Sequence, residues 1–274
     1  MNSLNKKTAL VTGASTGIGY ALAKELAKEG AHLILTATAR SEEKLFSLAE
    51  EIKAMGVNAD VFVKDLSIIG AAEELYSEIK SSGKEVDLLI NNAGYGRWGE
   101  LTSFDSKDYA KMIQLNIVAL TDLCHLYIPD MIAKGSGGII NVGSMASLSP
   151  IPYASIYSSS KAYVLMFSEA IRYEYQERGI KVMALLPGGT ESEFAKVATE
   201  KSEKLTERYK KRAGSNTGMQ TSKEVAIECI EAYKKDKQYI LCGRSNRMLY
   251  RITRLMSRRR ILGMTGNMFK RIAG

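Results

Sequence analysis

The sequence has 274 residues and a mass of 30.1 kDa, enough to bury a large core without metals or disulfides. Hydrophobic residues make up 45% and charged residues 25%, which excludes disordered, collagen-like and coiled-coil proteins. Three widely spaced cysteines and two histidines predict neither a disulfide scaffold nor a metal site. No run of about eighteen apolar residues suggests a spanning helix, and the N-terminus does not resemble a signal peptide. We therefore expect a cytoplasmic protein.

The net charge of +8 is unevenly distributed along the chain. Residues 237–274 contain ten basic residues and no acidic one, and the last acidic residue is Asp236. The first 236 residues contain 28 basic and 30 acidic side chains, a net charge of −2. The sequence therefore describes a nearly neutral body with a basic tail, and its high pI does not indicate a nucleic-acid-binding protein.

Short apolar runs alternate with amphipathic stretches along most of the chain. In chain order, we predict strands over 8–12, 32–36, 57–63, 86–91, 138–142, 180–186 and 238–242. The intervening helices are predicted over 20–28, 42–53 with Ser41 as the N-cap, 71–80, 106–133, 156–178 and 225–234. Continuous apolar strands between amphipathic helices predict an α/β fold with a doubly wound, seven-stranded parallel sheet. We expect a single domain over 1–243, followed by a helical tail over 244–274.

The first predicted strand runs into the glycine-rich turn Gly13-Ala14-Ser15-Thr16-Gly17-Ile18-Gly19. Glycine permits a sharp turn and a close approach of the backbone to a phosphate, and the next helix offers free N–H groups. The G-x-x-x-G-x-G spacing differs from the common G-x-G-x-x-G dinucleotide motif. Alone, the turn is compatible with pyrophosphate binding or with a simple connection between strand and helix.

Tyr157 and Lys161 are four positions apart in a predicted helix and therefore share one face. A free tyrosine has a pKa of ~10. A neighbouring ammonium group lowers this pKa because it stabilises the phenolate. The pair can thus act as a proton donor and acceptor near neutral pH, although the same spacing also occurs in exposed helices.

Further short motifs occur in the same order as these two, at Asn91-Asn92-Ala93-Gly94, Asn116, Ser144 and Pro187-Gly188. Ser144 precedes Tyr157 by thirteen residues. In this order and spacing, residues 7–242 resemble the single-domain short-chain dehydrogenases/reductases. The resemblance implies a Rossmann fold and an enzyme that interconverts a carbonyl compound and an alcohol.

The resemblance also implies a role for each matching catalytic residue. Tyr157 would give a proton to the carbonyl oxygen in reduction and take it from the alcohol in oxidation. Lys161 would lower the pKa of Tyr157 and hydrogen-bond the nicotinamide ribose. Ser144 would hold the substrate oxygen. Asn116 would bend its helix and hold a water that relays protons to Lys161.

Matching positions along the chain would bind the dinucleotide. Besides Tyr157 and Lys161, they are Gly13, Ser15, Thr16, Gly17, Ile18, Gly19, Asp65, Leu66, Asn92, Ala93, Gly94, Pro187, Gly188 and Thr190. The segment 36–41 lacks the acidic residue that binds the ribose 2′-hydroxyl of NAD, whereas Arg40 can pair with a 2′-phosphate. This favours NADP(H) over NAD(H). Ala37-Thr38 resembles a two-residue insertion, however, which could move Arg40 away from the phosphate.

Mostly apolar residues surround the expected substrate position, at Met145, Pro150, Ile151, Tyr153 and Gly189. They predict a lipophilic ketone, acyl derivative or steroid-like alcohol as substrate. Residues 191–222 form a charged insertion and a candidate lid, in which Phe194, Val197 and Leu205 recur at roughly helical spacing. These three side chains could equally pack onto the body. From the resemblance we expect a dimer or tetramer formed by the helices that carry Asn116 and Tyr157.

The tail combines a basic stripe with an apolar face. The stripe consists of Arg244, Arg247, Arg251, Arg254 and Arg258, and the apolar face of Met248, Leu249, Ile252, Leu255 and Met256. A single basic amphipathic helix of this kind binds either an anionic membrane surface, here the inner face, or the protein itself or a second subunit. A similar tail occurs in a bacterial subgroup of the family. Few aromatic residues argue against nucleic acid.

The sequence thus predicts an NADP(H)-dependent oxidoreductase with Tyr157 as general acid/base and a small lipophilic substrate. A fatty-acyl 3-ketoreductase is one specific version, which requires a pocket long enough for an acyl chain. The alternative of another class is a non-catalytic NADP-binding sensor or scaffold, recruited to a membrane or partner through the tail. The complete set of Ser144, Tyr157 and Lys161 argues against it, because a sensor needs no proton donor.

Overall fold

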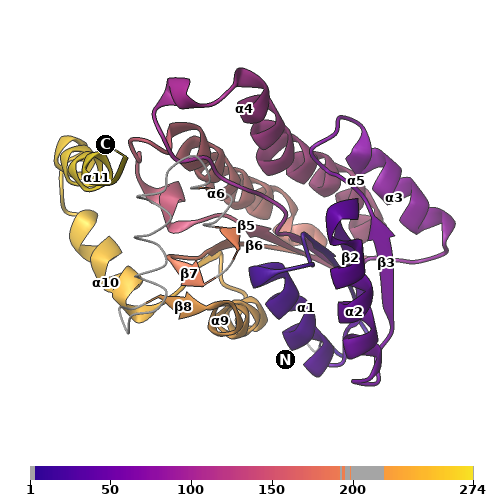
Figure 1. The fold of residues 1–274 in the computed structure, drawn as a ribbon. Coiled ribbons are helices and arrows are strands. Elements are labelled where there is room, and N and C mark those ends of the chain that lie inside the picture. Colours follow the sequence, from indigo (N-terminus) through magenta and orange to yellow (C-terminus); the bar gives the residue numbers. More distant parts are fainter. Residues whose placement is uncertain (1–3, 192, 195–197, 199–218, 274) are drawn as a thin grey trace.

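The computed structural model describes residues 4–191, 193–194, 198 and 219–273. Seven parallel strands form one sheet in the order β3-β2-β1-β4-β5-β6-β9 (Figure 1). They are β1 (Thr8–Thr12), β2 (His32–Ala37), β3 (Ala59–Val63), β4 (Leu88–Asn91), β5 (Gly137–Val142), β6 (Ile180–Leu186) and β9 (Tyr239–Leu241). The order reverses direction between β1 and β4, which places a crevice at the carboxyl ends of these strands. The predicted doubly wound Rossmann sheet is confirmed.

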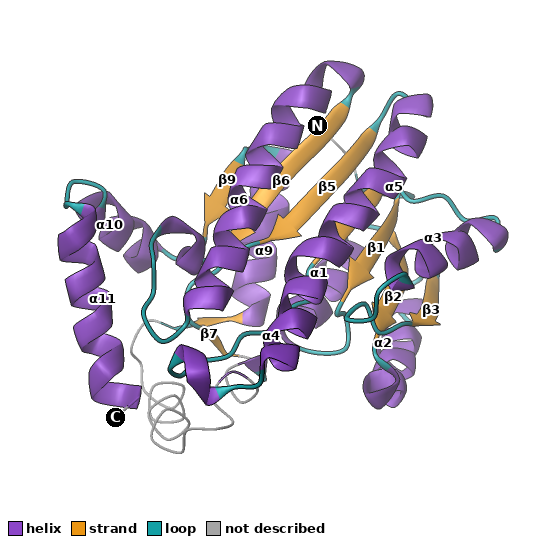
Figure 2. Ribbon diagram, turned by 90° about the horizontal axis from the view of Figure 1, so that it is seen from above, coloured by secondary structure: helices purple, strands orange, loops and turns teal. Residues whose placement is uncertain are grey.

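Helices cover both faces of the sheet (Figures 1 and 2). One face carries α1 (Gly17–Lys28), α2 (Glu42–Lys53) and α9 (Ser222–Lys234). The other carries α3 (Ala71–Ser81), α4 (Ser106–Ile113), α5 (Ala119–Ala133) and α6 (Ser155–Tyr175). Each helix buries an apolar stripe against the strands, such as Leu22 and Leu26 of α1 or Leu75 and Ile79 of α3. Two separate cores result, one on each side of the sheet.

Several element ends differ from the prediction by a few residues. Helix α1 begins at Gly17 rather than at residue 20, and strands β3 and β4 each begin two residues later than expected. Ser41 lies at the N-cap position of α2, but its side chain makes no capping hydrogen bond. Helix α6 ends at Tyr175, and a 3₁₀ turn over Gln176–Arg178 leads to Gly179 at a φ of 80°.

The long helix predicted over 106–133 contains a π-helical segment, η3 (Gln114–Val118), between α4 and α5. By length and composition alone, the continuous run Ser106–Ala133 could cross a membrane. Core helices pass the same test, and here Leu123 and Tyr127 are buried in the core on the α3 side of the sheet. This run is therefore a core helix of the fold.

The tail forms two helices, α10 (Arg244–Thr253) and α11 (Arg258–Ala273), on the side of the molecule where β9 and α6 lie (Figure 2). The prediction of one arginine stripe along a single helix is therefore wrong. The helix breaks before Ser257, whose hydroxyl and carbonyl both accept from the N–H of Arg260 and so start α11.

The two ends of the candidate lid lie side by side. Strand β7 (Thr190–Glu191) pairs in parallel with β8 (Gln220–Thr221), so the insertion leaves and rejoins the body at one place. Of the three apolar residues predicted to recur there, Phe194 is described below. Val197 and Leu205 lie outside the described residues.

Candidate active site

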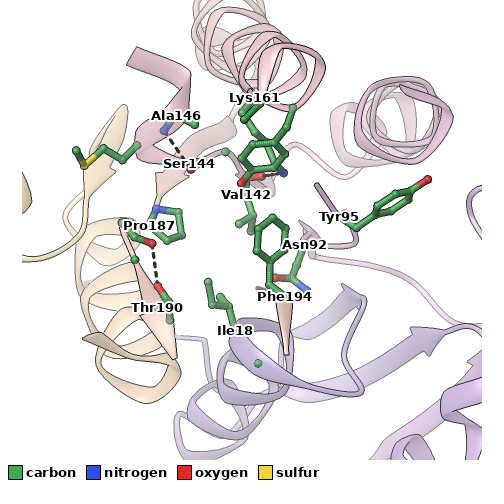
Figure 3. A pocket seen from close by; sticks show the side chains of 18 of the residues that line it. Ile18, Asn92, Tyr95, Val142, Ser144, Ala146, Lys161, Pro187, Thr190 and Phe194 are labelled. Carbon is green, nitrogen blue, oxygen red and sulfur yellow. Dashed lines mark hydrogen bonds between the residues drawn. The ribbon is translucent and has the colours of Figure 1, made fainter. Parts of the chain in front are cut away.

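A cavity of about 960 Å³ lies at the carboxyl ends of the parallel strands. It extends from the glycine turn after β1, past the loops after β4 and β5, to the C-terminal helices. Figure 3 shows Ile18 and Asn92 on one side of this space and Ser144 and Lys161 on the other, with Pro187 and Thr190 at its edge. The topology therefore brings together motifs that are far apart in the sequence.

The glycine turn is held tightly against the loop after β4. Gly13 has a φ of 64°, and a Cβ there would lie 2.9 Å from Cα of Ala93. The Thr12 hydroxyl accepts from the N–H groups of Asn92 and Ala93, each at 2.9 Å, and Asn92 Nδ2 donates to the Thr12 carbonyl. The resulting narrow cradle at the start of α1 fits a pyrophosphate, because the first N–H groups of a helix favour an anion and Gly13 has no Cβ to fill the turn.

The adenosine end of the cavity is formed by the segments after β2 and β3. Thr38, Ser41, Lys64, Asp65 and Leu66 line it. Asp65 is fixed there because its Oδ1 accepts from both the N–H and the hydroxyl of Ser67, at 3.0 and 2.7 Å. No acidic side chain follows β2 before Glu42.

Arg40 lies beside this end of the cavity rather than in its wall. It occupies a 3₁₀ turn, Ala39–Ser41, and its side chain is exposed. Its neighbours Thr38 and Ser41 line the cavity, so a phosphate at this end would meet hydroxyl groups first and the guanidinium at the rim.

Ser144 follows β5, where it both caps a short helix and lines the cavity. Its hydroxyl accepts from the N–H of Ala146 at 3.1 Å and so caps the short helix η4 (Met145–Leu148). Ser144 also lines the cavity, and its side chain is hydrogen-bonded to Tyr157. The two interpretations of such a serine, a cap or a substrate contact, are therefore compatible.

Tyr157 and Lys161 face the cavity from α6, and both side chains are buried. Burial raises the pKa of Tyr157 to about 12, although the hydrogen bond with Ser144 opposes this shift. Burial also lowers the pKa of Lys161 to about 8. In this state the phenol is a proton donor that stays protonated at neutral pH.

The expected lowering of the Tyr157 pKa by Lys161 is absent from this geometry. Lys161 Nζ donates a 2.7 Å hydrogen bond to the Val142 carbonyl, and Ser144 is the group that lowers the Tyr157 pKa. The ammonium is thus directed to the end of β5 rather than to the phenol. Because of this orientation, the ammonium does not lower the pKa of Tyr157.

Asn116 lies close to Lys161 but makes structural hydrogen bonds. Its Oδ1 accepts from the N–H of Tyr95 at 3.1 Å, and its Nδ2 donates to the Tyr95 carbonyl and to the Ser160 hydroxyl. A Cβ on Gly94 would lie 2.9 Å from Asn116 Oδ1 and 3.3 Å from Lys161 Nζ. The Asn116 and Lys161 side chains therefore both lie against Gly94, and the space there is too narrow for a larger residue.

The segment after β6 and the start of the lid complete the substrate side. Thr190 Oγ1 donates to the Gly188 carbonyl at 3.2 Å. The ring of Phe194 lies 5.4 Å from the ring of Tyr157, between centroids, so it contacts the candidate proton donor directly. Of the residues predicted around the substrate, Met145, Ile151 and Gly189 line the cavity, whereas Pro150 and Tyr153 do not.

A model of the short chain dehydrogenases matches residues 7–203, more than half of the sequence. The chain belongs to the short-chain dehydrogenase/reductase family. It is therefore an oxidoreductase with a nucleotide-binding Rossmann fold. The motifs that suggested the family are the ones that surround the cavity.

Individual relatives span most of the chain. It is 36% identical over 222 residues to the very-long-chain 3-oxoacyl-CoA reductase of Anas platyrhynchos, covering 78% of this chain and 69% of the relative. It is 29% identical to the ketoacyl reductase HetN of Nostoc sp., covering 93% and 85%. A solved short-chain dehydrogenase from Sphingobium yanoikuyae, in complex with NADPH, is similar with a TM-score of 0.74 and 27% identity, covering 86% and 87%.

Sequence reasoning missed part of the cavity wall of this family member. Lys64 and Trp98 line the cavity, as do residues of α10 and α11. Lys64 directly precedes Asp65, which was predicted to bind the dinucleotide, and this position next to a predicted contact could have identified Lys64. For the C-terminal helices no local signal exists, because the pattern of an amphipathic helix does not reveal which surface it packs against.

Proposed function

We propose that the protein is an NADP(H)-dependent oxidoreductase that interconverts a ketone or aldehyde with an alcohol. One observation carries the proposal: Ser144, Tyr157 and Lys161 line the same cavity as the glycine cradle. A dinucleotide held by the cradle would extend along this cavity toward the three side chains. The substrate carbonyl would then lie against Ser144 and Tyr157.

In the cavity between the glycine cradle and Tyr157, a nicotinamide cofactor would supply the hydride for the carbonyl carbon, or would accept one from the alcohol. In reduction, the Tyr157 hydroxyl gives its proton to the carbonyl oxygen while the carbon–oxygen π bond breaks. Ser144 holds the same oxygen through a hydrogen bond. The negative charge left on Tyr157 is stabilised by the hydrogen bond with Ser144. Oxidation uses the same groups in the opposite direction.

Charge at the adenosine end supports NADP(H). No carboxylate follows β2 to repel a 2′-phosphate, and the hydroxyls of Thr38 and Ser41 line the cavity with Arg40 at the rim. The similar Sphingobium yanoikuyae dehydrogenase was solved with NADPH, in agreement with this preference.

The substrate is lipophilic. Met145, Leu148 and Ile151 form an apolar wall beyond Ser144, and Phe194 adds an aromatic ring next to Tyr157. Relatives named as 3-oxoacyl-CoA and ketoacyl reductases make 3-oxoacyl compounds the first candidates.

The activity of the Tyr157→Phe variant, compared with that of the natural protein, tests the proposal. The purified protein is titrated with NADPH and NADH and then assayed against ketones, aldehydes and 3-oxoacyl thioesters. We expect Tyr157→Phe to abolish turnover and to bind NADPH as the natural protein does, because only the proton donor is removed. Retained turnover would contradict the catalytic role of Tyr157. If NADPH binds and no carbonyl compound is reduced, the sensor alternative gains support.

The exposed outer face of α10 supports the additional proposal of an anionic membrane contact. Met248 and Ile252 of α10 are 57% and 56% exposed, Leu255 just after the helix is 90% exposed, and Arg251 lies between them in the sequence. Co-sedimentation with phosphatidylglycerol vesicles, and not with phosphatidylcholine vesicles, would support this contact. Absence of binding to both would exclude it.

Exposed apolar residues of α6 support self-association as a dimer or tetramer. Met166 and Tyr173 are exposed on this helix, which also carries Tyr157. Light scattering on the purified protein measures the subunit number, and a monomer at all concentrations would contradict the proposal.

A further inference from the structure

The C-terminal helices form one wall of the catalytic cavity. The cavity that contains Ser144 and Tyr157 is also lined by Leu249, Tyr250, Thr253, Arg254, Met256, Arg258, Ile261, Met264 and Thr265. These residues come from α10, α11 and the turn between them. The tail is therefore part of the substrate-binding region of the fold.

Specific contacts hold α10 on the body. Arg247 Nη1 donates to Glu228 Oε2 at 2.7 Å and to the Leu241 carbonyl at 2.9 Å. Asn246 Nδ2 donates to the Cys242 carbonyl at 2.8 Å, and Tyr250 packs against a cluster that includes Leu186. A half-buried ion pair and a buried apolar contact fix this helix beside the end of β6.

Helix α11 contacts the segment between the candidate catalytic residues. Thr265 Oγ1 lies 3.4 Å from the Pro150 carbonyl, and the backbone at Gly266 approaches the ring of Pro152. Both prolines lie in the stretch between Ser144 and Tyr157. The inner face of α11 is thereby placed over the substrate end of the cavity.

This wall has two kinds of surface. Leu249, Ile261 and Met264 continue the apolar lining that Met145 and Ile151 begin on the body. An apolar lining of this extent fits an acyl chain, because each methylene placed against it is removed from water.

Two guanidinium groups lie on the same wall, those of Arg254 and Arg258. Arg247, in contrast, is paired with Glu228. Within the part of the chain that the structure describes, neither Arg254 nor Arg258 has a carboxylate within 4.0 Å. Two guanidinium groups next to an apolar cavity form a suitable site for the anionic head group of an otherwise lipophilic molecule.

We propose that Arg254 and Arg258 bind the anionic head group, a phosphate or carboxylate, of an acyl substrate whose chain lies along α10 and α11. The inference rests on the proposed reductase function and specifies its substrate as an anionic acyl derivative. The two arginines act on substrate affinity and not on the chemical step. Arg254 and Arg258 line the cavity, whereas the neighbouring Arg251 and Arg259 do not.

Binding of unreactive ligands tests this assignment independently of turnover. The probes share a lauroyl chain and lack a ketone: lauroyl-CoA carries phosphates, laurate a carboxylate, and lauroyl-N-acetylcysteamine no charge. Trp98 is the single tryptophan and lines the cavity, so its fluorescence reports binding in the full-length protein. We expect at least one anionic probe to bind tenfold or more tightly than the uncharged probe, and that probe identifies the head group.

The double variant Arg254→Ala/Arg258→Ala should reduce this tenfold difference to less than twofold and leave binding of the uncharged probe unchanged. The matched control is Arg251→Ala/Arg259→Ala, which removes the same charge from the same helices and should keep the difference. Equal binding of all three probes by the natural protein would overturn the inference. So would a difference that persists in the cavity-lining variant, or that is lost equally in the control. Turnover of 3-oxolauroyl-CoA, measured separately, tests the proposed reductase function itself.

Discussion

The Ser147 hydroxyl donates a 2.6 Å hydrogen bond to the backbone carbonyl of Lys161. The same hydroxyl accepts from the N–H of Ser144 at 3.2 Å. One buried side chain thus joins the segment that carries Ser144 to the helix that carries Tyr157 and Lys161. Ser147 itself does not line the cavity, so it positions the three candidate catalytic groups without contacting a substrate.

Substitution of Ser144 and Ser147 should therefore separate chemistry from stability. Ser144→Ala removes the hydroxyl that we propose holds the substrate oxygen, and we expect kcat/KM to fall by about 100-fold or more. Ser147→Ala removes the hydrogen bonds to the Ser144 N–H and to the Lys161 carbonyl, and we expect unfolding free energy to fall by roughly 1–3 kcal/mol with a smaller loss of activity. Chemical denaturation and steady-state kinetics measure both. Equal kinetic losses in the two variants would contradict the division.

The pKa of Lys161 should control the pH dependence of cofactor binding. Burial lowers this pKa to about 8, so the ammonium is charged below that pH and neutral above it. The anionic cofactor favours the charged form. NADPH affinity should therefore be constant from pH 7 to about 8 and then decrease, by up to about tenfold per pH unit.

Fluorescence titrations with NADPH between pH 7 and 10 measure this dependence. In Lys161→Met the affinity should be weaker at neutral pH and should lose the decrease above pH 8. A profile of the natural protein that stays flat to pH 10 would show that Lys161 does not charge the site. The exposed Lys107→Met variant serves as the control, because its side chain lies outside the cavity.

Much of the fold followed from local patterns. The central strands were predictable because they are buried on both faces, and a continuous apolar run such as 180–186 is a strong signal. Ser144, Tyr157 and Lys161 were predictable as a group because their spacing matches a family, and the structure brings them to one cavity. Their individual roles remain predictions.

Other parts depend on contacts between distant segments, which periodicity does not encode. The arginine pattern of the tail is regular, yet Ser257 divides it into two helices and Arg247 pairs with Glu228 of α9. The contribution of this tail to the cavity arises from its docking on the loop around Pro150. The orientation of Lys161 toward the Val142 carbonyl likewise depends on three-dimensional packing.

Removal of the Asn116 side chain should destabilise the fold. Its amide satisfies both backbone groups of Tyr95 and also donates to Ser160, and it is 1% exposed. Asn116→Ala would remove the side-chain partner of both Tyr95 backbone groups, so we expect a loss of about 2 kcal/mol in unfolding free energy. Thr121→Ala, nearby on α5, removes one partly buried hydroxyl that donates to the Ile117 carbonyl of its own helix, and should cost less than ~1 kcal/mol. Similar values for the two variants, measured by urea denaturation, would show that the Asn116 network adds little stability.

The choice between NADP(H) and NAD(H) should depend on the segment after β2. Arg40 is exposed between the cavity-lining residues Thr38 and Ser41, where its guanidinium could pair with the charged 2′-phosphate of NADPH but would meet only a neutral hydroxyl in NADH. We expect Arg40→Ala to weaken NADPH binding by tenfold or more and to change NADH binding by less than twofold. Lys53→Ala, which removes an exposed cation from the far end of α2, should change neither. If Arg40→Ala leaves NADPH binding unchanged, the phosphate is held by the hydroxyls that line the cavity, and Thr38→Ala or Ser41→Ala should then show the selective loss.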